Sequence, residues 1–238
     1  MNRSLFVFSL SLIVLCCMAQ NPKMIRLDNS DWWSVLKDDS VGPVVKPKKQ
    51  ALSPRNFQIA GIDLGTDFQK IVSKLGPSQI VERGDASTGR QQLCYRSDGI
   101  AGRTETHLIF EFGEVGSVAY LFNSERHWNG SNFCAHSKID LNSVHTNMGL
   151  KLGLRPHQVV SILGRPDLAR SGTFFYVREF KRKTTPQEFE QMRSNYSENV
   201  DDNTAHQMFD FYDVEMYVEA RFTQSKLTYL AMSQSETD

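Results

Sequence analysis

The sequence predicts an α+β protein built from two tandem repeats, each a short helix packed on a roughly four-stranded antiparallel sheet. Three observations lead to this fold class: a stretch of 15 residues occurs twice, alternating apolar and polar residues follow each copy, and turn-forming residues separate the alternating runs. Alternation with a period of two is typical of antiparallel strands that have one covered face. The amphipathic helix that precedes each set of strands is the natural cover for that face.

The duplicated stretch runs from Ile62 to Gly76 and returns 88 residues later, from Leu150 to Gly164. Six positions are identical, namely Leu64/Leu152, Gly65/Gly153, Val72/Val160, Ser73/Ser161, Leu75/Leu163 and Gly76/Gly164. Apolar residues at i, i+3, i+4 and i+7 predict one helix in each copy, and the closing glycine suits a helix C-terminus. Thr66 with Gln69 is the expected N-terminal capping box of the first helix, and Pro156 is the expected first residue of the second.

Residues 1–19 have the features of a secretory signal peptide. A positively charged start precedes an apolar run over residues 5–15, and small residues precede the expected cleavage between Ala19 and Gln20. The apolar run is shorter than the roughly 20 residues that span a bilayer. A membrane anchor, or a lipid attached at Cys16 or Cys17, remains an alternative to cleavage.

Residues 20–57 are expected to form a mobile N-terminal arm. The segment contains Pro43, Pro47 and Pro54 among charged residues, and such a composition buries little apolar surface. Trp32 and Trp33 are the exception. They are expected to dock either on the body of this protein or on a partner.

The first α+β repeat is expected over residues 58–138. After its helix, the predicted strands are 79–83, 91–96, 107–114 and 117–123. Cys94 and Cys134 are the two cysteines that survive cleavage, and an even pair in an exported chain predicts a disulfide. A catalytic thiol at Cys134, assisted by His136, is the alternative.

The second α+β repeat is expected over residues 139–238. A capping box from Thr185 to Glu188, with Pro186 at the first helical position, predicts an inserted helix near 186–196. The polar segment 197–203 is expected to be a loop. The predicted strands of this repeat are 168–171, 173–182, 211–223 and 226–232.

At these residues the chain resembles the β-lactamase inhibitory protein-like fold. The resemblance rests on Ile62-x-Leu-Gly, on the Leu-Gly helix endings and on the order of one helix and a four-stranded meander. This fold is shared by tandem-repeat secreted inhibitors and by small envelope lipoproteins of the SmpA/BamE type, which help to assemble outer-membrane proteins. The resemblance implies an exported bacterial protein with this architecture over about residues 58 to 232.

Composition and motif spacing argue against several functions. Lysine plus arginine and aspartate plus glutamate number 27 each, so the chain lacks the basic excess that nucleic-acid binding favours. No second apolar segment reaches spanning length, so the mature chain is expected to have no transmembrane segment and to be secreted or periplasmic. The six histidines lack the short spacings of zinc sites. The sequence therefore predicts no catalytic, metal-binding or cofactor-binding residue and no cofactor.

The remaining candidate is a binding surface. Mixed aromatic, arginine and carboxylate side chains are typical of protein-binding patches. The outward faces of two adjacent sheets are expected to present Ile109, Glu111, Phe175, Val177, Tyr217 and Arg221. This predicts a non-catalytic module that binds a protein or a cell-envelope component.

A secreted hydrolase with an unrecognised site is the alternative function. Clustering of His107 and Glu111 with His127 or His136 in one pocket would favour it, because histidine and carboxylate side chains carry general acid–base catalysis.

Overall fold

The computed structural model describes residues 24–26, 48–49, 57–83, 89–97, 105–113, 116–123, 133–196 and 201–237. The predicted signal peptide, Trp32 and Trp33 lie outside these residues. So does most of the predicted arm.

The described chain contains four α-helices and thirteen strands, most of them antiparallel. The first half comprises β3 (Gln58–Ile59), β4 (Ile62–Asp63), α2 (Phe68–Leu75), β5 (Ile80–Arg83), β6 (Arg90–Arg96), β7 (Thr106–Gly113), β8 (Gly116–Asn123) and β9 (Ala135–His136). The second half comprises η4 (Leu141–Ser143), α3 (Pro156–Leu163), β10 (Leu168–Arg170), β11 (Thr173–Lys183), α4 (Pro186–Asn195), α5 (Asp202–Phe209), β12 (Phe211–Thr223) and β13 (Lys226–Thr237). The predicted α+β class is thus confirmed.

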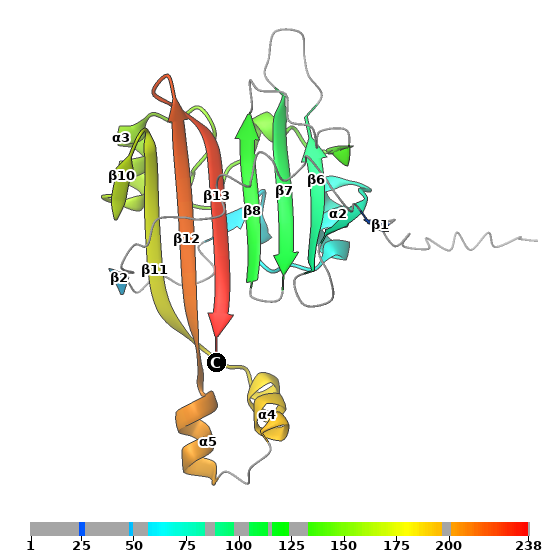
Figure 1. The fold of residues 1–238 in the computed structure, drawn as a ribbon, viewed down its shortest axis with the longest axis vertical. Helices are drawn as coiled ribbons and strands as arrows, with labels where there is room; N and C mark the ends of the chain where they lie inside the picture. Colours follow the sequence, from blue (N-terminus) through cyan, green and yellow to red (C-terminus); the bar gives the residue numbers. More distant parts are fainter. Residues whose placement is uncertain are drawn as a thin grey trace, which may run out of the picture.

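Apart from the β3–β4 hairpin, the strands of the two halves form one continuous sheet instead of the two adjacent sheets that the sequence suggested. Its order is β1-β5-β6-β7-β8-β13-β12-β11-β10, so β8 of the first half and β13 of the second lie at the join (Figure 1). There β8 and β13 pair antiparallel, with Phe122 opposite Tyr229 and Ser117 opposite Gln234. Pairing β8 with β13 satisfies backbone N–H and C=O groups that two separate sheets would each leave at an open edge.

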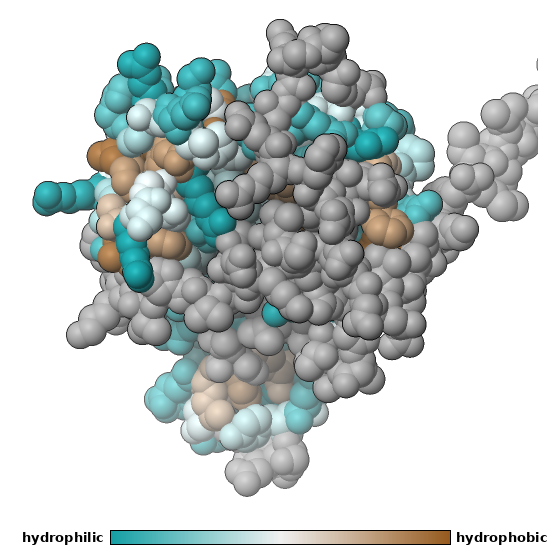
Figure 2. Space-filling model, turned by 45° about the horizontal axis from the view of Figure 1, so that its top comes forward, coloured by the Kyte–Doolittle hydropathy of each residue, from teal (hydrophilic) through white to brown (hydrophobic). Residues whose placement is uncertain are grey.

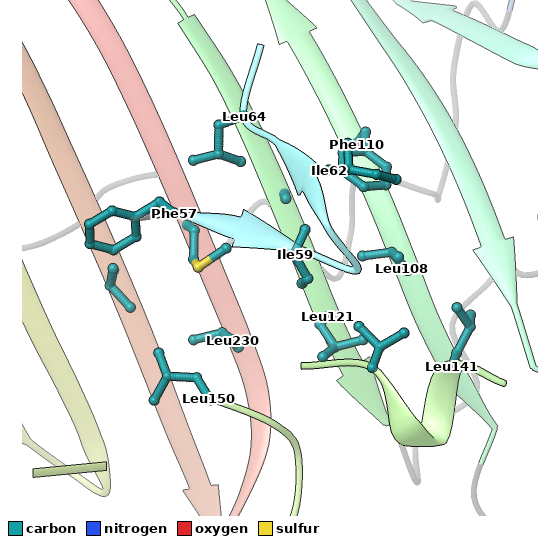
Figure 3. Close-up of a cluster of buried hydrophobic side chains, with 14 of the residues drawn as sticks. Phe57, Ile59, Ile62, Leu64, Leu108, Phe110, Leu121, Leu141, Leu150 and Leu230 are labelled. Carbon is teal, nitrogen blue, oxygen red and sulfur yellow. The ribbon is translucent and has the colours of Figure 1, made fainter. Parts of the chain in front are cut away.

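The hydrophobic core is also continuous across the join. The β3–β4 hairpin lies over the sheet with Ile59 and Ile62 directed into the core, and Leu141 and Leu150 approach from the connector between the halves (Figure 3). The start of the first half is hydrogen-bonded to the start of the second, because the amide of Ala60 donates to His145 O at 3.2 Å and that of Asn147 to Gln58 O at 3.1 Å. The two halves therefore share one main hydrophobic core.

The two helices that follow the duplicated glycines have matching ends. Gly76 and Gly164 have φ of 105° and 80°, a left-handed conformation that favours glycine, and their amides donate to the carbonyls of Val72 and Val160. The Tyr95 hydroxyl donates to Gly76 O at 3.0 Å, and the Tyr176 hydroxyl donates to Gly164 O at 3.3 Å. Duplication of the two halves stays a prediction, which these correspondences support.

The helix starts partly differ from expectation. The side chain of Asp67, instead of the predicted Thr66–Gln69 box, caps α2 by accepting from the Lys70 amide at 2.9 Å. Asp67 lies one residue later, where its carboxylate reaches the amide three residues on. Pro156 does begin α3, as expected.

The inserted segment forms two helices instead of one. The Thr185–Glu188 capping box begins α4, as predicted. The helix α5 was not predicted. It starts at the end of the expected loop, where Asp201 accepts from the Thr204 amide at 3.0 Å. The two helices project beyond one end of the sheet from the long strands β11 and β12 (Figure 1).

Two short strands lie within the segment that was predicted to be a mobile arm. The strand β1 (Met24–Arg26) pairs parallel with β5, and β2 (Lys48–Lys49) pairs parallel with β11 at Arg178 and Glu179. Such pairing needs only backbone groups at a sheet edge, so a composition poor in apolar residues does not prevent it.

Candidate functional site

The six residues of the predicted sheet surface share the sheet face opposite the main core. The cross-strand register lines up Phe175, Glu219, Ala231, Tyr120 and Ile109 across the join between the halves. A neighbouring row contains Val177, Tyr217, Ser233, Val118 and Glu111, and Arg221 lies opposite Tyr229 in a third row.

None of these six residues is fully exposed, and four of them are buried. Ile109, Glu111, Phe175 and Val177 are buried, and Tyr217 and Arg221 are partly buried. The expected open platform is therefore wrong for those four. Ile109 is buried because it belongs to a smaller hydrophobic cluster on this face, together with Phe122 and Tyr229. Glu111 is buried in an ion pair with Arg90, and the Phe175 ring lies against Tyr217. A strand that is apolar on both faces needs cover on both sides.

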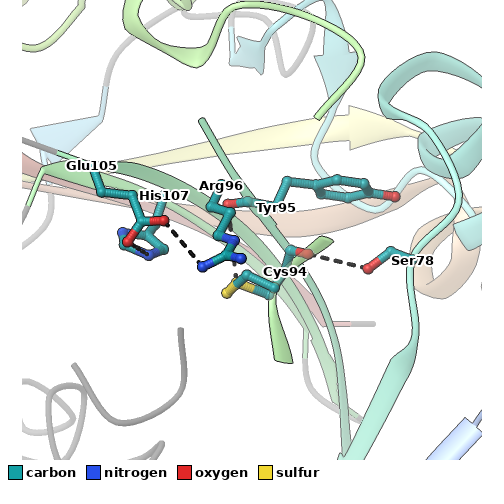
Figure 4. The surroundings of a disulfide bond; sticks show 7 residues. Ser78, Cys94, Tyr95, Arg96, Glu105 and His107 are labelled. Atoms are coloured by element: carbon teal, nitrogen blue, oxygen red, sulfur yellow. Dashed lines mark hydrogen bonds and ion pairs between the residues drawn. A yellow bond between two sulfur atoms is a disulfide. The ribbon is translucent and has the colours of Figure 1, made fainter. Parts of the chain in front are cut away.

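The Cys94–Cys134 disulfide is formed and lies within this smaller cluster. It joins β6 to the residue just before β9 and so attaches the connector between the halves to this face (Figure 4). The Ser78 hydroxyl donates to Cys94 O at 3.1 Å, which adds a contact from the segment after α2. Because both sulfur atoms are in the disulfide, the alternative of a free catalytic thiol at Cys134 does not fit this structure.

His107 and Glu111, the residues on which the alternative hydrolase function depends, contact different residues. His107 is buried, stacks on Phe122 and has its Nε2 3.4 Å from Glu105 Oε2. Burial, and secondly the charge of Arg96, lowers the pKa of His107 to about 4. Glu111 lies four residues along β7, a rise of about 13 Å.

Glu111 is bound at its own end of the strand. Its carboxylate pairs with Arg90 at 2.7 Å and accepts a hydrogen bond from the side-chain amide (Nε2) of Gln92. His136 contacts Arg96 at 3.1 Å instead of His107, and His127 lies outside the described residues. The structure therefore does not bring His107 and Glu111 together in one pocket.

Two further kinds of site are absent from the part of the chain that the structure describes. Over these residues, no three histidine, cysteine, aspartate or glutamate side chains are grouped where they could hold a metal ion. None of the described helices combines the length and apolarity needed to cross a bilayer.

A cavity of about 270 Å³ lies between α3 and the strands of the second half. Its wall is mainly apolar and contains one charged side chain, Arg178, which pairs with the buried Asp167 at 2.6 Å. The lining residues are Phe57, Met148, Ile162, Leu163, Gly164, Tyr176, Arg178, Met216 and Val218. The sequence pattern did not predict this cavity, since most of the lining residues also fit ordinary core positions.

The second feature that the sequence pattern did not predict is the helical extension, which we define as residues 184–196 and 201–210. Thr184 closes its base, because its hydroxyl donates to Phe209 O at 2.8 Å and its amide to Asp210 O at 2.9 Å. Arg193 bridges α4 to α5 through Asp202 at 2.6 Å. These contacts fix the two helices to each other and to the sheet.

Aromatic rings pack between the two helices of the extension. Phe189 stacks on His206 with ring centroids 4.8 Å apart and meets Phe209 edge-on at 6.3 Å. Tyr196 contacts Phe209 at 5.6 Å but leaves 42% of its surface exposed. The aspartate that caps α5, followed by Ala205 and Phe209 four residues apart, is the sequence signal that could have identified this helix.

An arginine anchors the extension to the sheet. Arg182 in β11 pairs with Glu188 of α4 at 3.0 Å and with Glu236 of β13 at 2.6 Å. Its guanidinium also lies 4.7 Å from the ring centroid of Tyr212. The hydrogen bond from Arg182 lowers the pKa of Glu188 to about 2, although burial opposes this shift.

Comparison of the chain with protein-family models, with curated proteins and with solved structures finds no match in any of the three. Assignment to the β-lactamase inhibitory protein-like or SmpA/BamE-type fold stays a prediction. The function is therefore inferred from the geometry of the extension and of the cavity.

Proposed function

We propose that this chain is an exported, non-catalytic binding module that uses the helical extension to hold another protein. The observation that carries the proposal is the distribution of exposed apolar side chains. Among the described residues, the large hydrophobic side chains with high exposure are Tyr196, Met208 and Phe211, at 42%, 39% and 47%. All three lie on the extension or at the start of the strand that leaves it, and Figure 2 shows apolar side chains gathered there at the bottom of the view.

Exposed aromatic and methionine side chains on a firmly held projection favour a protein partner. Such residues are enriched where protein surfaces meet, and they add contact area at small entropic cost when the scaffold beneath them is already ordered. The Arg182 anchor and the Thr184 hydrogen bonds supply that order.

The charge of the extension indicates the chemistry of the partner. The described residues of the extension contain one arginine, Arg193, against five carboxylates: Glu188, Glu190, Asp201, Asp202 and Asp210. The chain as a whole has a formal net charge of +0, so the acidic excess is local. A partner with a basic surface around an apolar recess complements this extension.

The disulfide supports the exported part of the proposal. Structural disulfides persist in oxidising compartments, which include the periplasm and the extracellular space. The Cys94–Cys134 bond is buried, as expected for a structural disulfide instead of a catalytic one.

Site-specific cross-linking tests this function. A photoreactive side chain at Met208 should cross-link one basic protein in an extract of the source cells, and the same group at exposed His157 on α3 should not. With that protein purified, Met208→Ala and Phe211→Ala should each weaken binding about tenfold, while Gln187→Ala on the exposed polar side of α4 should not. Equal cross-linking from both positions, or equal affinities for all variants, would contradict the proposal.

A further inference from the structure

The cavity beside α3 has the size and lining of a small-molecule site. Its volume of about 270 Å³ is nearly twice that of the roughly 150 Å³ apolar cavity that accommodates benzene in a well-studied engineered protein. Aliphatic and aromatic side chains from α3, β11 and β12 form most of the wall, together with Phe57 and Met148 from the connecting segments.

The corresponding place in the first half is filled. Leu75 and Ile71 of α2 are completely buried, whereas Val159 is the only fully buried residue of α3, and Leu163, which matches Leu75, remains partly exposed. Phe68 begins α2 and meets Phe112 edge-on with ring centroids 4.5 Å apart. Its counterpart in α3 is Pro156, which is too small to make the same contact.

The C-terminal end of α2 is covered by other residues, whereas that of α3 is open. A segment of the connector covers the end of α2, since the Lys138 amide donates to Leu75 O at 2.8 Å and the Lys138 side chain lies against Gly76. At Gly164, a Cβ atom would meet no described atom within 4 Å. The helix α3 therefore leaves open space over strands that α2 covers in the first half.

The charged side chain in the cavity wall, Arg178, is already paired with a carboxylate. The Arg178 guanidinium pairs with Asp167 at 2.6 Å and donates to Val177 O at 2.7 Å, and the Asp167 carboxylate also accepts from the Val177 amide. Both charged side chains are almost completely buried. Since their charges balance, a charged ligand would bring one uncompensated charge into the cavity, which is costly.

We propose that this cavity is a binding site for an uncharged apolar small molecule, with an alkyl chain or aromatic group of up to about eleven carbons as its buried part. This scale follows from the cavity being nearly twice the size of one that holds the six carbons of benzene. The site is separate from the helical extension and does not depend on the proposed protein partner.

Methionine methyl NMR tests the proposal with 1-octanol as the probe. Met148 and Met216 line the cavity, while Met208 is exposed on the extension and so serves as an internal control. Octanol should shift the Met148 and Met216 methyl signals saturably and leave that of Met208 unchanged. Octanoate at neutral pH should bind at least tenfold more weakly, because its carboxylate is charged.

Two filling variants and a matched control complete the experiment. Ile162→Phe, at a partly exposed position on the rim, and Val218→Phe, on the floor, should each reduce octanol affinity at least tenfold. Lys74→Phe places the same ring at the position of α2 that corresponds to Ile162 and should leave the affinity unchanged. The proposal is overturned if octanol gives no saturable shift, if octanoate binds equally well, or if a folded Ile162→Phe protein binds like the wild type.

Discussion

Leu75 and Leu163 occupy the same position at the ends of two eight-residue helices, yet Leu75 is completely buried and Leu163 is only partly buried. The duplicated sequence predicts matching buried positions for these two leucines, and the structure differs from that prediction. The difference arises from the neighbours of each helix. Lys138 and the connector lie over the end of α2, while α3 borders a cavity.

Truncating these two leucines should have unequal effects. Leu75→Ala removes a fully buried side chain and should lower the free energy of unfolding by about 2–5 kcal/mol. Leu163→Ala should cost less than half as much, since solvent already reaches its site. Chemical denaturation measures both, and the exposed His157→Ala on α3 should stay within about 0.5 kcal/mol. Equal costs for the two leucines would contradict this assignment of burial.

Acid should loosen the helical extension before the rest of the fold. The folded-state pKa of Glu188 is about 2, below its ordinary value of 4.5, so its pairing stabilises the folded extension above pH 4.5. That contribution is lost as the pH falls from 4.5 through about 2. Hydrogen exchange of the α4 amides should therefore quicken, relative to the intrinsic rate, between pH 5 and pH 2.

The variant Arg182→Gln should expose α4 to exchange already at neutral pH and remove most of this pH dependence. Lys181→Gln is the matched control, because the Lys181–Asp213 pair is exposed at 3.4 Å and contributes little. Unchanged α4 protection in Arg182→Gln would show that the anchor does not hold the extension.

His107 should stay neutral well below the ordinary titration range of histidine. Burial lowers its folded-state pKa from 6.5 to about 4, so the unfolded chain binds more protons between these values. The stability associated with neutral His107 is present above pH 6.5 and is lost as the pH falls through about 4. NMR titration of the ring carbons should show no change at His107 above pH 5, and a midpoint near 6.5 would contradict the burial.

Removing the disulfide should destabilise the whole sheet. The bond closes a separation of 40 residues, which corresponds to about 4 kcal/mol in the chain-entropy model. The double variant Cys94→Ala/Cys134→Ala should unfold at lower denaturant concentration by about that free energy. Alkylation of the denatured, unreduced wild type should label neither cysteine, and two labelled cysteines would contradict the bond.

The leader makes a prediction about the mature chain. Export should remove residues 1–19, so the mature protein should begin at Gln20. Intact-mass spectrometry of exported protein measures this directly. Folded material that retains Met1 would contradict cleavage, and an added lipid mass at Cys16 or Cys17 would support the lipoprotein alternative.

The sequence by itself determined most of the main helices and strands and the faces of those strands. Gly76 and Gly164 mark the ends of α2 and α3 because a left-handed residue is needed there, and the Thr185–Glu188 box marks the start of α4. Alternation in β7 assigned Leu108 and Phe110 to the main core. These features depend on local backbone geometry and side-chain period, which neighbouring residues suffice to specify.

Only the tertiary structure decided how the halves combine and which faces remain open. Pairing of β8 with β13 depends on residues about a hundred positions apart, and no local pattern distinguishes one joined sheet from two. Alternation assigned Ile109 and Glu111 to the second face but carried no information on whether that face is covered. The cavity beside Leu163 likewise depends on how α3 packs against β11 and β12. The exposure of Met208 and Phe211 depends on the projection of the helical extension beyond the sheet. Burial is a property of packing between distant segments, so the local sequence did not reveal it.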